Sequence, residues 1–130
     1  MTAATAPKKI LIVDDEPGVV DVLREFFERS PEKYAVQTAS NGQEALAAVR
    51  RDVPNLVLLD IDMPGMDGVT ALKQILTIDT GIAVMMITGN ADAAPAEALR
   101  LGAFAYLPKP VNFTYLEQFV PLALLRRRKA

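Results

Sequence analysis

Short, unbroken runs of apolar residues recur along the chain, and longer segments with a helical repeat separate them. The clearest runs are residues 10–13, 56–59 and 83–87. Such runs are typical of strands in a parallel sheet that is covered on both faces, because neither face of the strand meets water. Residues 34–39 and 103–106 form weaker runs, for which we predict shorter or more peripheral strands.

Helices are predicted between these strands from apolar spacing and from the residues at the helix ends. Pro17 suits a first helical turn, and the apolar positions after it repeat at helical spacing. Asn41 with Glu44 resembles a capping box, and a further helix is expected after Gly68. Asp92 is the predicted N-cap of a fourth helix that ends at Gly102, and Asn112 is the predicted N-cap of a fifth. Strands and helices thus alternate, which predicts a doubly wound α/β fold with a five-stranded parallel sheet.

Two prolines fall inside the last two helical segments. Pro95 is compatible with a fourth helix that starts late, near Ala94. Pro121 removes a backbone hydrogen-bond donor and therefore predicts a kink in the fifth helix.

Composition narrows the class of protein. The 130 residues suffice for one domain with a sizeable core, and 51% hydrophobic with 23% charged residues is typical of a globular chain. The net charge of −2, spread over mixed acids and bases, argues against a face that binds nucleic acid. Cysteine and histidine are absent, which excludes disulfides, thiol catalysis, histidine acid–base chemistry and imidazole metal sites. Because no signal peptide or membrane-spanning run is recognisable, we expect a cytoplasmic protein without membrane insertion.

We expect one domain over residues 9–125, preceded by a flexible arm at residues 1–8 and followed by a basic tail at residues 126–130. The basic residues of the tail complement the dipole of a helix that ends there. They are also few for contacts with nucleic acid. No direct nucleic-acid binding by this domain is expected.

Polar residues gather where the predicted strands end. Asp14 and Asp15 follow the first strand, Asp60 follows the third, Thr88 follows the fourth and Lys109 lies just past the fifth. Ligands of open parallel sheets bind at the carboxyl ends of the strands, so three carboxylates converge if the first and third strands are neighbours. Two carboxylates about 4 Å apart repel by roughly 4 kcal/mol at an effective dielectric of 20. A divalent cation such as Mg²⁺, together with the lysine ammonium, would neutralise the three carboxylates.

Four segments carry a family resemblance: residues 10–17 (ILIVDDEP), 58–68 (LLDIDMPGMDG), 87–89 (ITG) and 102–110 (GAFAYLPKP). In order and spacing they resemble the receiver domain of response regulators, from about Lys9 to the fifth helix. The resemblance implies a flavodoxin-like, three-layer (βα)5 fold with strand order 2-1-3-4-5.

The resemblance also implies roles for the polar residues. Asp60 would accept a phosphoryl group from a sensor histidine kinase or phosphotransfer protein, and Lys109 and Thr88 would bind phosphoryl oxygens. Mg²⁺ (or Mn²⁺) would be held by the following groups: Asp15, Asp60, the backbone carbonyl of Asp62 and, through water, Asp14. Because the chain has no histidine, it cannot carry the phosphohistidine itself. The domain would be no enzyme beyond its own phosphorylation and dephosphorylation.

The output end of the implied switch involves Thr88 and Tyr106. Tyr106 has two equally weighted interpretations, a core aromatic or a ring that swings inward when the threonine moves. Asp62 and Asn90 occupy positions that tune the phosphoryl lifetime in the family. A cis Lys109–Pro110 bond is favoured by the resemblance. The signal would pass to a downstream protein or a fused output domain, and a homodimer that forms on phosphorylation is compatible with the family.

Taken singly, several of these residues have ordinary structural roles. Glu16 is interpreted as a first-turn acid of the first helix, and Asp67–Gly68 as a turn.

Two alternative functions stay open at this point. Asp60-Ile61-Asp62 also resembles the first motif of haloacid dehalogenase-type phosphatases, although Met63-Pro64 and the early position of the Asp14–Asp15 pair do not fit. A phosphorylation-independent interaction module with the same fold is the second alternative. A flavodoxin-like cofactor carrier is weaker, because no phosphate-cradling loop follows the first strand.

Overall fold

The computed structural model of the protein describes residues 7–63, 65–89 and 95–125. Within these residues strands and helices alternate along the chain. The strands are β1 (Lys8–Val13), β2 (Tyr34–Ala39), β3 (Leu56–Asp60), β4 (Ala83–Thr88) and β5 (Ala105–Pro108). The helices are α1 (Pro17–Arg29), α2 (Gly42–Arg51), α3 (Gly68–Ile78), α4 (Pro95–Arg100) and α5 (Phe113–Leu124). The alternation predicted from the sequence is confirmed.

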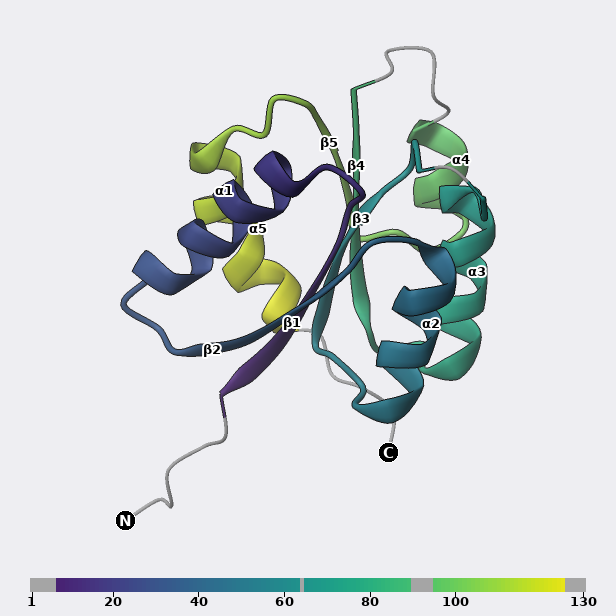
Figure 1. Ribbon diagram of the computed structural model, residues 1–130, viewed down its shortest axis with the longest axis horizontal. Helices are drawn as coiled ribbons and strands as arrows, with labels where there is room; N and C mark the ends of the chain where they lie inside the picture. The colour runs from purple at the N-terminus through teal and green to yellow at the C-terminus, as the bar shows by residue number, and fades with distance from the viewer. Residues whose placement is uncertain (1–6, 64, 90–94, 126–130) are drawn as a thin grey trace.

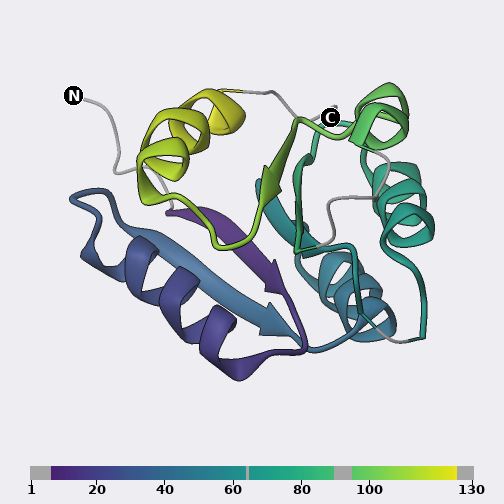
Figure 2. The same cartoon turned by 90° about the horizontal axis from the view of Figure 1, so that it is seen from above.

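The five strands form one parallel sheet in the order β2-β1-β3-β4-β5. Helices α1 and α5 cover one face of the sheet, and α2, α3 and α4 cover the other (Figures 1 and 2). This confirms the predicted doubly wound fold and its strand order. Because β1 and β3 are neighbours at the centre of the sheet, their carboxyl ends lie side by side.

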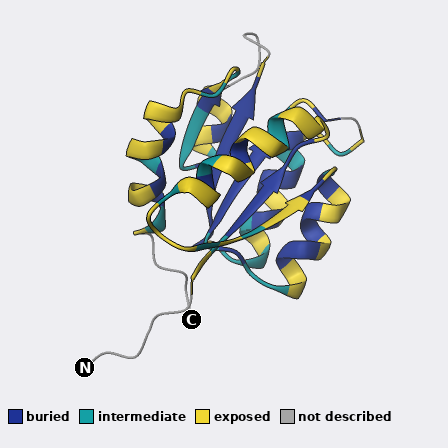
Figure 3. Cartoon of the chain, turned by 60° about the vertical axis from the view of Figure 1, so that its left-hand side comes forward, coloured by how far each residue is buried: buried dark blue, intermediate teal, exposed yellow. Residues whose placement is uncertain are grey.

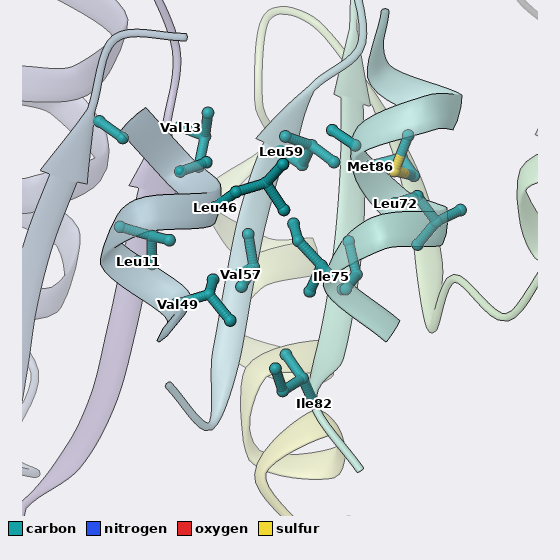
Figure 4. Packing of buried hydrophobic residues seen from close by; sticks show 14 of the residues in the cluster. Leu11, Val13, Leu46, Val49, Val57, Leu59, Leu72, Ile75, Ile82 and Met86 are labelled. Atoms are coloured by element: carbon teal, nitrogen blue, oxygen red, sulfur yellow. The ribbon is translucent and has the colours of Figure 1, made fainter. Parts of the chain in front are cut away.

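An apolar core lies on each face of the sheet. Figure 4 shows the core beneath α2 and α3, where Leu46, Val49, Leu72 and Ile75 pack against the strands. Burying one such side chain contributes roughly 1.5–3 kcal/mol. Strands β3 and β4 are buried along their whole length (Figure 3), which explains their unbroken apolar sequences. Strand β2 lies at the sheet edge and is largely exposed, which explains its weaker pattern.

The helix ends follow the predicted signals. Pro17 occupies the first turn of α1. The Asn41 side chain accepts a hydrogen bond from the Glu44 backbone nitrogen at 2.8 Å, and Glu44 Oε1 accepts one from the nitrogen of Ser40. Asn112 caps α5 in the same way. Asp92, the predicted cap of the fourth helix, lies outside the described residues.

Two details of the sequence-based prediction change, and a third is confirmed. The Asp67 carboxylate caps α3 by accepting from two backbone nitrogens, so Asp67–Gly68 is a helix start and not merely a turn. The fifth strand begins at Ala105 instead of Ala103, because Ala103 still donates its backbone N–H to the carbonyl of Ala98. Gly102 has a φ of +114°, which confirms it as the stop after α4.

Helix α5 continues through Pro121 to Leu124. The proline therefore does not end the helix, and the kink stays a prediction. In the part of the chain that the structure describes, every helix is too short or too polar to span a lipid bilayer.

Candidate phosphoacceptor and metal site

The carboxyl edge of the sheet brings the predicted site residues together. Asp60 ends β3 and pairs in register with Ile87 of β4, directly before Thr88. The backbone nitrogen of Lys109 donates to the carbonyl of Thr88 at 2.7 Å, which fixes the residues after β5 beside the end of β4. Asp14 follows β1, and its backbone nitrogen donates to the carbonyl of Ala39 at the end of β2. The predicted cis peptide bond before Pro110 is present.

Four carboxylates cluster at this edge. One oxygen from each of Asp14, Asp15, Glu16 and Asp60 lies within 4.8 Å of the others. Asp14 and Asp60 are only 3% and 2% exposed, whereas Asp15 and Glu16 reach solvent. The sequence predicted the three aspartates of this cluster but not the glutamate.

Lys109 is the cation that faces these carboxylates. Its Nζ lies 2.8 Å from Glu16 Oε1, 3.2 Å from Asp14 Oδ2 and 3.3 Å from Asp60 Oδ2. Burial alone would lower the pKa of the lysine, but the hydrogen bond to Glu16 and the close carboxylates of Asp14 and Asp60 together raise it. Lys109 therefore stays protonated at neutral pH.

Glu16 has a different role from the one predicted. It is the N-cap residue of α1 and not a member of its first turn, and its side chain makes no capping hydrogen bond. The carboxylate turns instead toward Lys109. Its place directly after the Asp14–Asp15 pair is the sequence signal that it belongs to the same edge. The site consequently holds one more negative charge than the sequence analysis predicted.

Asp60 is a buried carboxylate with a raised pKa. Burial is the largest cause, and the charge of Asp14 adds to it. Two contacts oppose the rise: the backbone N–H of Asp62, which donates to Asp60 Oδ1 at 3.0 Å, and the ammonium of Lys109. These contacts hold the carboxylate in one orientation, and burial leaves its ionised form poorly solvated.

Thr88 lies on the far side of the site from Asp14. Its hydroxyl donates to Asp62 Oδ2 at 2.6 Å, and the backbone nitrogen of Gly89 donates to the same oxygen at 3.2 Å. Tyr106 on β5 is half-buried and shares a hydrogen bond with Thr88. Burial and the negative charge of Asp62 raise the pKa of the Tyr106 phenol, and the hydrogen bond with Thr88 opposes this rise. The sequence analysis did not predict the contact between the Asp62 side chain and Thr88.

The donor set of this edge fits a hard divalent cation. Asp14 Oδ2 is buried and makes no hydrogen bond, although it lies 3.2 Å from Lys109 Nζ. The ammonium of Lys109 is shared among three carboxylates, so it offsets the charge of this buried oxygen only in part. Four carboxylates face one ammonium here, and carboxylate oxygens are the ligands that Mg²⁺ and Ca²⁺ prefer. The cluster is therefore a candidate metal site.

Comparison with known proteins gives one consistent family. Residues 10–120 match the family model described as the response regulator receiver domain. Sporulation initiation phosphotransferase F of Bacillus subtilis is 40% identical over 115 residues, which cover 87% of this chain and 90% of that protein. Regulatory protein AtoC of Escherichia coli is 40% identical over 121 residues, which cover 92% of this chain but only 26% of that protein. The chain thus spans nearly all of one relative and about a quarter of another.

Solved structures agree with this result. A response regulator receiver domain protein described as CheY-like, from Methanospirillum hungatei, superposes with a TM-score of 0.84 at 33% identity, covering 92% of this chain and 94% of that one. A putative response regulator from Chloroflexus aurantiacus has the same TM-score at 30% identity, covering 93% of this chain and 100% of that one.

Proposed function

This chain belongs to the response regulator receiver family of two-component systems, and we propose that Asp60 is the residue on which it accepts the phosphoryl group. The observation that carries the proposal is the setting of Asp60. Its carboxylate is buried at the end of a central strand, held by the backbone N–H of Asp62 and 3.3 Å from the ammonium of Lys109. Such a group is positioned as a nucleophile and faces a cation that offsets developing negative charge.

The transfer proceeds by displacement at phosphorus. A carboxylate oxygen of Asp60 forms a bond to phosphorus as the phosphorus–nitrogen bond of a phosphohistidine breaks. The electron pair of that bond leaves with the imidazole of the donor, and the product on this chain is an acyl phosphate. These 130 residues contain no histidine, so the phosphohistidine lies outside them, on a histidine kinase or a phosphotransfer protein.

The ammonium of Lys109 and the hydroxyl of Thr88 bind phosphoryl oxygens in this proposal. Lys109 already lies within 3.3 Å of Asp60 and exchanges a carboxylate partner for a phosphoryl oxygen. Thr88 is buried at the end of β4, the neighbouring strand. Both act by position and charge, which provide most of the catalysis in phosphoryl transfer.

A divalent cation, Mg²⁺ or Mn²⁺, fits the same edge and supplies neutralisation of the phosphoryl and carboxylate charges. The residues proposed to hold it are Asp15, Asp60, the backbone carbonyl of Asp62 and, through water, Asp14. The buried Asp14 Oδ2 supports this assignment, because among the described residues it has an ion pair with Lys109 but no hydrogen bond. Glu16 lies in the same carboxylate cluster and adds negative charge that favours cation binding.

We expect two kinds of partner for this chain. The upstream partner is the phosphohistidine donor. Downstream is a target protein or an output domain on the same polypeptide, as the partial coverage of AtoC suggests. The family match leaves the haloacid dehalogenase hypothesis without support.

The proposal is tested by incubating the protein with acetyl phosphate and Mg²⁺ and measuring intact mass. Wild type is expected to gain one phosphoryl group, and Asp60→Asn none. Glu28→Gln, which removes an exposed carboxylate in the last turn of α1, is the control and should label like wild type. Equal labelling of wild type and Asp60→Asn would refute the assignment. Labelling that persists in excess EDTA would refute the metal role. No labelling of any variant favours the phosphorylation-independent module.

A further inference from the structure

The carboxylate of Asp62 occupies two donors at the edge of the phosphoacceptor site. Asp62 Oδ2 accepts from the Thr88 hydroxyl at 2.6 Å and from the backbone N–H of Gly89 at 3.2 Å. Thr88 is 2% exposed, whereas Asp62 is exposed. A short, solvent-exposed carboxylate thus binds a buried hydroxyl through a charge-assisted hydrogen bond.

These donors lie where a phosphoryl group on Asp60 would need them. Asp60 ends β3, and its register partner on β4 directly precedes Thr88. A phosphoryl oxygen and a carboxylate oxygen are both anionic acceptors, so the same two donors suit either. A hydroxyl has a single proton and cannot donate fully to both.

We propose that the Asp62 side chain is an internal competitor of the phosphoryl group: it holds the Thr88 hydroxyl and the Gly89 amide in the unphosphorylated protein and must release them before they bind a phosphoryl oxygen. This inference rests on the proposed function of Asp60. Asp62 acts here through its partners, so it is a positioning residue and forms no bond to phosphorus.

The contact extends toward β5. Because an ionised carboxylate only accepts, the one proton of the Thr88 hydroxyl is directed to Asp62. Thr88 also shares a hydrogen bond with Tyr106 on β5. The carboxylate of Asp62 therefore orients the Thr88 hydroxyl as a phosphoryl oxygen would. Phosphorylation exchanges one anion for another at the start of this hydrogen-bonded chain.

A simpler effect of Asp62 would be repulsion of an anionic phosphodonor. The two explanations differ in what happens when the charge is removed but the hydrogen-bond acceptor is kept. Asp62→Asn keeps an acceptor oxygen, whereas Asp62→Ala removes it. They differ again when Thr88 is replaced by alanine, because competition is then confined to the Gly89 amide whereas repulsion is unchanged.

The experiment measures the initial rate of Asp60 labelling by limiting acetyl phosphate with Mg²⁺. If the competing contact is populated most of the time, Asp62→Ala is expected to label about tenfold faster than wild type, and Asp62→Asn about threefold faster. In a Thr88→Ala background, the effect of Asp62→Ala should fall to about twofold or less, since coupled residues are not additive. Glu28→Gln is the control for loss of one exposed carboxylate.

A second measurement needs no phosphorylation. In metal-free protein, the Gly89 amide resonance should move upfield in Asp62→Ala as its hydrogen bond is lost, and should not move in Glu28→Gln. An unchanged Gly89 resonance overturns the proposal. The proposal is also overturned if the labelling rate of Asp62→Ala stays within twofold of wild type, or if Asp62→Ala and Asp62→Asn accelerate labelling equally. It is overturned too if the acceleration by Asp62→Ala is undiminished in the Thr88→Ala background. If wild type gains no phosphoryl group on Asp60, the proposed function and this inference both fail; if it labels normally and only the Asp62 effects are absent, this inference fails alone.

Discussion

Asp60→Asn is expected to stabilise the metal-free protein while abolishing its phosphorylation. The substitution removes the charge of a buried carboxylate but keeps an oxygen that can accept from the backbone N–H of Asp62. It also removes one member of a cluster of four carboxylates that faces a single ammonium. Four carboxylates this close to a single ammonium are expected to repel one another when no further cation is bound.

The magnitude follows from the distances. At an effective dielectric of 20, Asp14 within 4.8 Å repels the charge of Asp60 by about 3.5 kcal/mol or more, and Lys109 at 3.3 Å attracts it by about 5 kcal/mol. Asp15 and Glu16 reach solvent and add about 1 kcal/mol of repulsion each at the dielectric of water. Attraction and repulsion therefore nearly cancel. The desolvation cost of the buried carboxylate is left over, and we expect Asp60→Asn to gain about 1–3 kcal/mol.

Thermal unfolding in EDTA, followed by circular dichroism, measures this gain. For a domain of this size, about 1–3 kcal/mol corresponds to a rise in Tm of roughly 3–12 °C. Adding Mg²⁺ at 100 times its Kd should stabilise wild type by about 2.7 kcal/mol and so raise its Tm. The Tm of Asp60→Asn should rise less. Glu28→Gln should stay within about 0.5 kcal/mol of wild type. A Tm of Asp60→Asn equal to or below that of wild type in EDTA would refute the electrostatic reasoning.

Three further predictions concern the same edge of the sheet. In EDTA, the raised pKa of Asp60 means that the folded state binds this proton more tightly than the unfolded state does. The free energy of unfolding should therefore fall as the pH rises from the ordinary pKa of 3.8 through the raised pKa. Urea titrations of Asp60→Asn should show a weaker fall. Gly68→Ala should destabilise the fold by about 1–3 kcal/mol, because a Cβ there would lie 2.6 Å from the Cα of Ile61. Gly18→Ala should stabilise α1 by about 0.5–1 kcal/mol, because the space around its Cβ is open. Equal urea midpoints for the two variants would contradict this prediction. Glu16→Gln should weaken Mg²⁺ binding in calorimetric titrations because it removes one of the four carboxylates, and an unchanged Kd would show that this side chain serves the lysine alone.

The strands at the centre of the sheet were predictable because burial on both faces leaves a direct trace in the sequence. All three strong apolar runs fall inside β1, β3 and β4. The fifth strand was displaced by two residues in the prediction, because its start depends on how Ala103 and Gly102 complete the end of α4. Backbone hydrogen bonds of that kind leave no apolar pattern.

The site was predictable to a similar extent. Asp14 and Asp15 directly follow β1 and Asp60 is the last residue of β3, so the direction of the chain already places them at one edge. Their roles as metal ligands and phosphoacceptor stay predictions until the labelling and metal-binding experiments are done. The side chains of Glu16 and Asp62 were assigned incompletely, since each reaches its partner across the gap between two segments far apart in the sequence.

By itself, the sequence determined the alternation of strands and helices, the five-stranded parallel sheet and the edge at which acidic residues, threonine and lysine would meet. The direction of the backbone and the burial of each strand set these features, and both can be read from short stretches of the sequence. Only the tertiary structure decided which side chains contact one another: Lys109 is shared among three carboxylates, and Asp62 holds the Thr88 hydroxyl. Those contacts depend on the spacing of neighbouring strands and on the torsions of flexible side chains, which residue order alone does not fix.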